Sequence, residues 1–167
     1  MGSQARVIAL GGIMAALAVC IMSLGGLIPV ATYAVPILCM LLLQIVRKSC
    51  GNRIAWAWYG AVMILGLLLS PDKEAASVFT ALGYYPIVKP KLDSMKLPWL
   101  WKSLLFNGTI LLLYWALLHL FGLAQVAEDL EGAGLAMTAA LLVMGNVVFF
   151  LTDILLGRGL RKFGVKG

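Results

Sequence analysis

Residues 103–123 read SLLFNGTILLLYWALLHLFGL, an apolar run whose only ionisable side chains are His119 and Tyr114. A helix rises about 1.5 Å per residue, so this run is long enough to cross roughly 30 Å of hydrocarbon. Across the chain 62% of residues are hydrophobic and 12% are charged, whereas a soluble domain carries about a quarter charged residues. The sequence therefore predicts an integral membrane protein rather than a soluble globular one.

Five further apolar segments flank this run, separated by charged residues or by glycine and proline. We predict a single all-α domain, 1–167, that forms a polytopic transmembrane bundle of six helices with short loops. The predicted segments are Val7–Leu24, Val30–Val46, Ile54–Leu69, Ala75–Val88, Ser103–Leu123 and Gly134–Leu156. The fourth is short and carries Gly83 and Pro86, which indicates a tilted, broken or partly buried helix and leaves five crossings as the alternative.

The first segment also fits a secretory signal peptide, because Arg6 precedes an apolar run that contains Ala16-Leu17-Ala18. The run continues past Ala18 without a polar start of a mature chain. This continuation favours a membrane helix.

Basic residues divide unevenly between the predicted loops. With six crossings, every Lys and Arg except Lys73 falls on one side of the membrane. Positive charge collects in cytoplasmic loops, so we predict that both termini lie in the cytoplasm. The outer side carries most of the acidic residues, namely Asp72, Glu74, Glu128, Asp129 and Glu131.

Catalytic and metal-binding groups are sparse. Intramembrane catalysis needs two cooperating groups, and the predicted spans offer His119 near the outer end and Asp153 near the inner end, too far apart for a dyad. Cys20, Cys39 and Cys50 lack the spacing of a zinc site. We expect no enzyme activity, no metal site and no cofactor. The basic clusters between apolar runs favour acidic lipid over nucleic acid as their partner.

Three polar side chains, Asn107, Asn146 and Asp153, interrupt long apolar helices. An unpaired polar group in lipid costs about 2–3 kcal/mol, so we expect these side chains to face the bundle interior or a polar cavity. Hydrogen bonding between helices is the favoured interpretation, with Asp153 meeting Lys102 or Arg158.

A small-molecule site is predicted at the outer face. His119 lies there near Tyr114 and Trp115, an aromatic pair that suits a ring-shaped ligand. An interfacial belt is the alternative, because Trp and Tyr collect at headgroup depth whatever the function. Residues of earlier segments reach the same side and complete the predicted substrate contacts, which are Tyr33, Ser77, Thr80, Tyr114, Trp115 and His119.

Small residues form two stripes on the first segment. Gly11 and Ala15, and likewise Gly12 and Ala16, are spaced four positions apart, and such pairs let a second helix approach closely. The stripes predict either contact with a partner subunit or packing inside the bundle.

The chain length, the six short-looped helices, the cytoplasmic termini and the striped first helix resemble the S components of energy-coupling factor (ECF) transporters. The resemblance covers the whole chain and rests on topology. It implies a membrane subunit that captures a vitamin-like molecule at the outer face, while separate subunits hydrolyse ATP. It also implies that the small-residue stripes contact a transmembrane coupling subunit, through Gly11, Gly12, Ala15 and Ala16. No substrate motif of a particular vitamin branch matches, so no ligand identity follows.

A non-transporting membrane scaffold of the cell envelope is the alternative function. In that case the basic loop from Lys89 to Lys102, with Pro90, Trp99 and Trp101, would be a docking or membrane-surface element.

Overall fold

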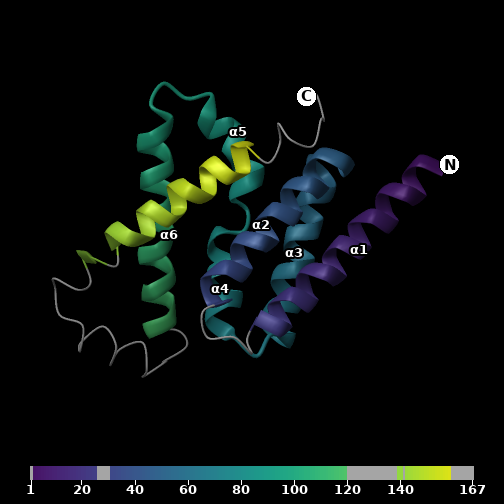
Figure 1. The fold of residues 1–167 in the computed structure, drawn as a ribbon, viewed down its shortest axis with the longest axis horizontal. Coiled ribbons are helices and arrows are strands. Elements are labelled where there is room, and N and C mark those ends of the chain that lie inside the picture. Colours follow the sequence, from purple (N-terminus) through teal and green to yellow (C-terminus); the bar gives the residue numbers. More distant parts are fainter. Residues whose placement is uncertain (1, 26–30, 120–138, 141, 159–167) are drawn as a thin grey trace. The chain divides into compact units, whose positions relative to one another are not determined.

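The computed structural model describes residues 2–25, 31–119, 139–140 and 142–158, and within these ranges the chain is helical with no strand. Figure 1 labels six helices, α1 (Gly2–Gly25), α2 (Ala31–Cys50), α3 (Asn52–Leu69), α4 (Lys73–Leu82), α5 (Tyr85–Asp93) and α6 (Pro98–His119). A further helical stretch covers 142–158. The all-α prediction is confirmed for the described residues, whereas the number of membrane crossings stays a prediction.

The chain divides into two compact units, Met1–Ser94 and Met95–Gly167. We call them unit 1 and unit 2. Unit 1 holds α1 to α5, and unit 2 holds α6 and the helical stretch 142–158. A single domain over 1–167 stays a prediction.

The core of unit 1 lies between α1, α2 and α3, with α4 and α5 packed against α2 and α3. Midway along the helices, the Cys39 thiol of α2 donates to the Ala18 carbonyl of α1 at 3.7 Å. The buried core side chains come from all five helices and are Ala18, Met22, Val35, Cys39, Leu43, Val46, Ala55, Trp58, Val62, Phe79 and Ile87.

A single residue, Gly51, connects α2 to α3. Its φ of 87° lies in the left-handed region, which costs glycine little and other residues more. The Gly51 N–H donates to the Arg47 carbonyl at 3.0 Å and so closes the end of α2. This turn reverses the chain and sets α3 antiparallel to α2.

Hydrogen bonds define two opposite ends of unit 1. At the first, Ser70 donates to the Met22 carbonyl at 3.3 Å and Thr32 donates to Asp72 at 2.8 Å. We call this the Asp72 end. It also carries Lys73 and Glu74 at the start of α4.

At the opposite end the Cys50 thiol donates to the Val7 carbonyl at 3.6 Å, and Arg47 donates to the Pro86 carbonyl. We call this the Arg47 end. Figure 1 shows α4 and α5 at opposite ends of unit 1, with α5 at the end where α1 starts. Apart from Lys73, the other basic residues of unit 1 are close to these contacts along the chain and therefore gather here, namely Arg6, Lys48, Arg53, Lys89 and Lys91.

The fourth apolar segment is two short helices, as its glycine and proline indicated. Asp72 caps α4 by accepting a hydrogen bond from the Ala75 N–H at 2.9 Å. The helix ends at Gly83, and α5 begins at Tyr85 with Pro86 in its first turn. Both helices bury one face in unit 1, so this segment is broken and largely enclosed.

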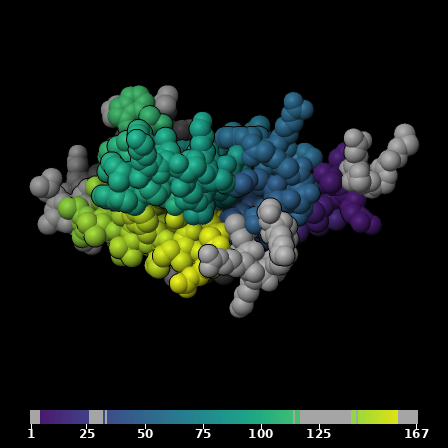
Figure 2. All heavy atoms as spheres, turned by 90° about the horizontal axis from the view of Figure 1, so that it is seen from above, coloured from purple at the N-terminus to yellow at the C-terminus, as the bar shows by residue number. Residues whose placement is uncertain are grey.

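In unit 2 the 142–158 helix packs against α6 in the opposite direction, because Asn146 meets Asn107 while Asp153 meets Lys102. Between these two polar contacts the Phe106 and Phe149 rings stack with centroids 4.7 Å apart. In Figure 2 the atoms of this helix are yellow-green to yellow.

Two of the described helices are long and apolar enough to cross a membrane, Ala5–Gly25 and Asn52–Leu69. In each helix only 22% of the apolar stretch is buried, so neither helix is enclosed by the rest of the described chain. Large apolar side chains such as Ile13 (65% exposed) and Leu68 (71% exposed) point outward instead. This exposure is the expected pattern for helices that contact lipid.

Gly83→Ala is expected to destabilise unit 1. A Cβ there would overlap the Phe79 carbonyl oxygen and lie 2.8 Å from a carbon of its ring. Overpacking of this kind costs about 1–3 kcal/mol. Gly60→Ala is the matched control, because nothing lies within 4 Å of a Cβ at that position. Thermal unfolding followed by circular dichroism should give a lower Tm for Gly83→Ala alone, and equal Tm values would contradict the close approach at the helix break.

Candidate functional site

Five polar side chains form two neighbouring contacts between the two helices of unit 2, an ion pair and a hydrogen-bonded group of three. We call them the polar cluster, and they are Lys102, Ser103, Asn107, Asn146 and Asp153. Their spacing places them on facing stripes, because positions three, four or seven apart share one side of a helix. The cluster therefore follows from two amphipathic stripes in otherwise apolar helices.

The ion pair of the cluster is enclosed. Lys102 Nζ lies 2.8 Å from Asp153 Oδ2, and the two side chains are 8% and 14% exposed. Removing either charge would leave the other without its main counter-charge in an apolar setting, which is costly. The expectation that Asp153 meets Lys102 is confirmed.

The two asparagines form a reciprocal pair. Asn107 Nδ2 donates to Asn146 Oδ1 at 3.1 Å, and Asn146 Nδ2 donates to Asn107 Oδ1 at 2.9 Å. The second amide proton of Asn107 is donated to the Ser103 carbonyl, and that of Asn146 to the Leu142 carbonyl, each within its own helix. Because an amide nitrogen has two protons, both donors are fully used, and the expected interhelical hydrogen bonds are confirmed.

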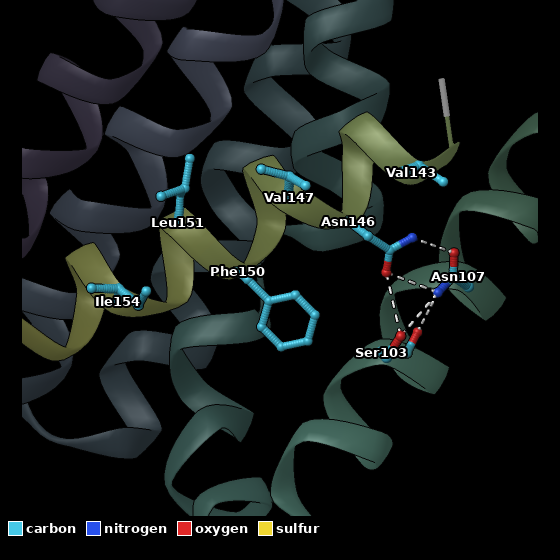
Figure 3. A pocket seen from close by; sticks show the side chains of 8 residues that line it. All are labelled: Ser103, Asn107, Val143, Asn146, Val147, Phe150, Leu151 and Ile154. Carbon is cyan, nitrogen blue, oxygen red and sulfur yellow. Dashed lines mark hydrogen bonds between the residues drawn. The ribbon is translucent and has the colours of Figure 1, made fainter. Parts of the chain in front are cut away.

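A groove of about 460 Å³ runs along this contact. Figure 3 shows Asn146 turned toward Asn107 and Ser103, with the hydrogen bonds dashed. The remaining lining is apolar, and the full set is Ser103, Asn107, Val143, Asn146, Val147, Phe150, Leu151 and Ile154. The groove thus offers an apolar wall beside polar groups that are already bonded to one another.

The break between α4 and α5 is the second place where polar groups are paired inside apolar surroundings. Pro90 has no N–H, so the Pro86 carbonyl four residues earlier has no helical donor. The Arg47 guanidinium of α2 donates to that carbonyl. The Arg47 guanidinium is charged, as arginine is throughout proteins, and this strengthens the hydrogen bond.

A second side chain serves the other side of the break. The Tyr59 hydroxyl of α3 donates to the Thr80 carbonyl near the end of α4. The Tyr59 ring contacts Phe79 and Tyr84, with centroid distances of 5.8 Å and 6.2 Å. Two neighbouring helices therefore hold the interrupted segment through its carbonyls and rings.

The predicted substrate contacts lie in both units. Tyr33, Ser77 and Thr80 belong to unit 1, and Tyr114, Trp115 and His119 belong to unit 2. The side chains of Tyr33, Tyr114 and His119, and the acidic residues Glu128, Asp129 and Glu131, lie outside the described parts of the chain.

Of the predicted contacts whose side chains are described, Ser77 is half-buried and Trp115 is 56% exposed. The Thr80 hydroxyl donates to the Ala76 carbonyl of its own helix at 2.8 Å, which uses its proton. A pocket that joins the predicted contacts of unit 1 with those of unit 2 stays a prediction.

The two small-residue stripes of α1 differ in their surroundings. Gly11 is buried, and a Cβ there would contact Ile54 of α3 at 3.9 Å, while Ala15 packs against the core of unit 1. Gly12 and Ala16 are exposed, and nothing lies within 4 Å of a Cβ at Gly12. The first stripe therefore packs inside unit 1, and the second faces outward.

Ser103 supplies the hydroxyl of the polar cluster, and its hydrogen bond shows what that hydroxyl contacts. The Ser103 hydroxyl donates to the Asn146 amide oxygen at 3.3 Å, and an amide oxygen is not a general base. In the described ranges no group of three or more His, Cys, Asp and Glu residues could hold a metal ion. That the protein is not an enzyme and has no cofactor stays a prediction.

Sequence reasoning missed the contacts at the helix break. Charge alone places Arg47 on the cytoplasmic side, and nothing in the sequence singles out Tyr59. One signal was present, because Pro90 deprives the Pro86 carbonyl of its helical partner and so requires a donor from elsewhere. The helix that supplies the donor is decided by packing, which a single sequence does not display.

Asp153→Leu is expected to lower the free energy of unfolding by about 3–5 kcal/mol, because it removes the carboxylate that pairs with the buried Lys102 charge. The double variant Lys102→Met with Asp153→Leu should recover most of that loss, since it removes both charges. Unfolding of the purified protein in mixed micelles with increasing dodecyl sulfate measures both changes. Equal loss in the single and double variants would mean that the ion pair does not couple the two helices.

A comparison of the chain with protein-family models, with curated proteins and with solved structures finds no match.

Proposed function

We propose that this chain is a multi-pass protein of the cell membrane that acts as the substrate-binding subunit of a small-molecule uptake transporter. The observation that carries the transport proposal is the interrupted α4–α5 segment inside unit 1. Discontinuous helices at membrane depth are tolerated where protein encloses them, and in transporters they line substrate sites. The hydrogen bonds from Arg47 and Tyr59 supply that enclosure here.

The membrane location is supported by what unit 1 exposes. Ile8, Ile13 and Leu24 of α1 are 63–70% exposed, and Leu68 and Leu69 of α3 are 60–71% exposed. In water such a surface is unfavourable by about 25 cal/mol for each Å² of apolar area, and in hydrocarbon this term disappears. Lipid is therefore the solvent that suits these helices.

The orientation is supported by the charges at the two ends of unit 1. The Arg47 end carries six of the basic residues, while the Asp72 end carries Asp72, Lys73 and Glu74. Cytoplasmic loops are enriched in Lys and Arg, so the Arg47 end faces the cytoplasm and the Asp72 end faces outward. With six crossings both termini are cytoplasmic.

The proposed ligand site lies at the outer side. Ser77 and Thr80 stand on α4 between the Asp72 cap and the helix break, and Trp115 exposes an aromatic face on α6. Tyr33, Tyr114 and His119 complete the proposed contacts. The ligand class is a small ring-bearing molecule that is neutral or positively charged, because the outer loops are acidic.

The transport proposal also needs partner subunits. The chain contains no nucleotide-binding motif, so ATP hydrolysis would belong to separate ATPases. The outward stripe of Gly12 and Ala16 is the surface proposed for a transmembrane coupling subunit, since small residues admit a close helix. The resemblance to ECF S components led to this assignment, and the exposure of the two residues supports it.

A scaffold protein of the cell envelope is the second candidate. The observation that favours it is the closed bonding of the polar cluster, in which both asparagine amides use all their protons internally. Such a cluster holds two helices together without a ligand. Mass spectrometry of small molecules released from the purified protein separates the candidates, because a transport subunit should carry a stoichiometric ligand and a scaffold should not.

Trp115→Ala and His119→Ala are expected to weaken binding of the ligand identified in that way. Removing one aromatic anchor from a desolvated pocket costs about 2–4 kcal/mol, or roughly 30-fold to 1000-fold in affinity. Trp56→Ala is the control, because Trp56 is also an exposed tryptophan (44%) but belongs to α3. Isothermal titration calorimetry measures the effect. Unchanged affinity in both variants would assign the two residues to an interfacial belt.

Gly12→Leu is expected to abolish co-purification of a partner subunit while leaving Tm nearly unchanged, because its side chain would project from the outward stripe of α1. Gly11→Leu is the matched variant on the inward stripe, and it should lower Tm through a clash with Ile54 of α3. Affinity purification from the native membrane, followed by thermal unfolding, reports both effects. The docking surface is wrong if Gly12→Leu unfolds the protein and leaves its partners bound.

A further inference from the structure

The end of unit 2 where α6 begins carries basic and aromatic side chains together. The antiparallel contact of Lys102 with Asp153 brings the end of the 142–158 helix to the level of the start of α6. Arg158 therefore lies at the same end as Lys96, Trp99 and Trp101. We call these four residues the basic–aromatic surface.

The charges of this surface are not neutralised within the described chain. The nearby Lys102 and Asp153 pair with each other, so they contribute no net charge. Lys96 and Arg158 are both exposed, and neither takes part in an ion pair with a described residue. The surface thus presents two positive charges to its surroundings, and these charges favour an anionic partner over a neutral or cationic one.

Its apolar side chains are strongly exposed as well. Trp99 is 61% exposed and Trp101 is 45% exposed, and the adjoining Leu97 and Leu100 are 50% and 46% exposed. Tryptophan prefers the headgroup region of a bilayer, where its ring is half apolar and its N–H meets water. Lys and Arg next to such rings reach the phosphate level with their long side chains.

The depth of the surface agrees with this preference. Asn107 lies nine residues beyond Pro98, or about 14 Å further along α6, and pairs with Asn146 inside apolar surroundings. Trp99 and Trp101 are in the first turn of the same helix. In the proposed membrane location the asparagine pair thus lies deeper in the hydrocarbon, and the basic–aromatic surface stands nearer the boundary.

We propose that the basic–aromatic surface binds the headgroups of acidic phospholipids in the cytoplasmic leaflet. The charge complementarity of Lys96 and Arg158 with lipid phosphates, at the same end of unit 2 as two exposed tryptophans, carries this inference. It rests on the proposed membrane location and is independent of the transported ligand. Acidic lipid would fix the depth of α6 and therefore the level of the polar cluster that follows it.

Native mass spectrometry of the full chain, purified in detergent and supplied with equal amounts of phosphatidylglycerol and phosphatidylcholine, tests the proposal. The protein should retain phosphatidylglycerol preferentially, and the preference should fall as salt is raised. Lys96→Gln and Arg158→Gln should each reduce it about fivefold, as expected for one basic residue near an anionic surface. Trp99→Ala should weaken retention of both lipids and leave the preference unchanged.

Lys73→Gln is the matched control, because Lys73 is an exposed lysine at the Asp72 end of unit 1 and should leave the preference unchanged. Equal retention of the two lipids by the unaltered protein would overturn the proposal, and so would an equal loss in Lys73→Gln. A chain that stays in solution without detergent would instead contradict the membrane location itself. The two failures are therefore distinguishable.

Discussion

The pairing of polar groups inside apolar helices is the constraint on which both units depend. In unit 1 the end of α4 and the proline inside α5 free backbone carbonyls, and Tyr59 and Arg47 bind two of them, at Thr80 and Pro86. In unit 2 the same requirement is met by side chains across two helices. Without water to bond these groups, each unpaired one would cost several kcal/mol, so their partners limit how the helices can pack.

The sequence predicts the helices well because apolar runs and charge breaks are local signals. The break at Gly83 and Pro86 is also a local signal, whereas the predicted start at Ala75 missed the Asp72 cap and the first turn of α4, which begins at Lys73. Contacts between helices were predictable only where few partners exist. Asp153 is the single acid within its apolar helix, and only two basic residues, Lys102 and Arg158, were expected at its depth. The structure pairs it with Lys102.

The candidate site is less predictable for the same reason. Gly11 and Gly12 are neighbours in sequence, yet one packs against Ile54 and the other faces outward. A stripe of small residues does not specify which helix it meets. The role of Arg47 at the Pro86 carbonyl likewise depends on the crossing of α2 with α5, although Pro90 signals that a donor is needed. Polar function inside a bundle is therefore set by packing that one sequence displays only in part.

The central claim is that unit 1 spans the membrane with its Arg47 end inside and its Asp72 end outside. Single cysteines at Lys73→Cys and Lys91→Cys, in a chain whose Cys20, Cys39 and Cys50 are replaced by alanine, test it directly with a membrane-impermeant maleimide. Both positions are exposed, so reactivity depends on sidedness. Intact cells should label the cysteine at position 73, and only permeabilised cells should label the one at position 91. Equal labelling of both positions in intact cells would contradict the account.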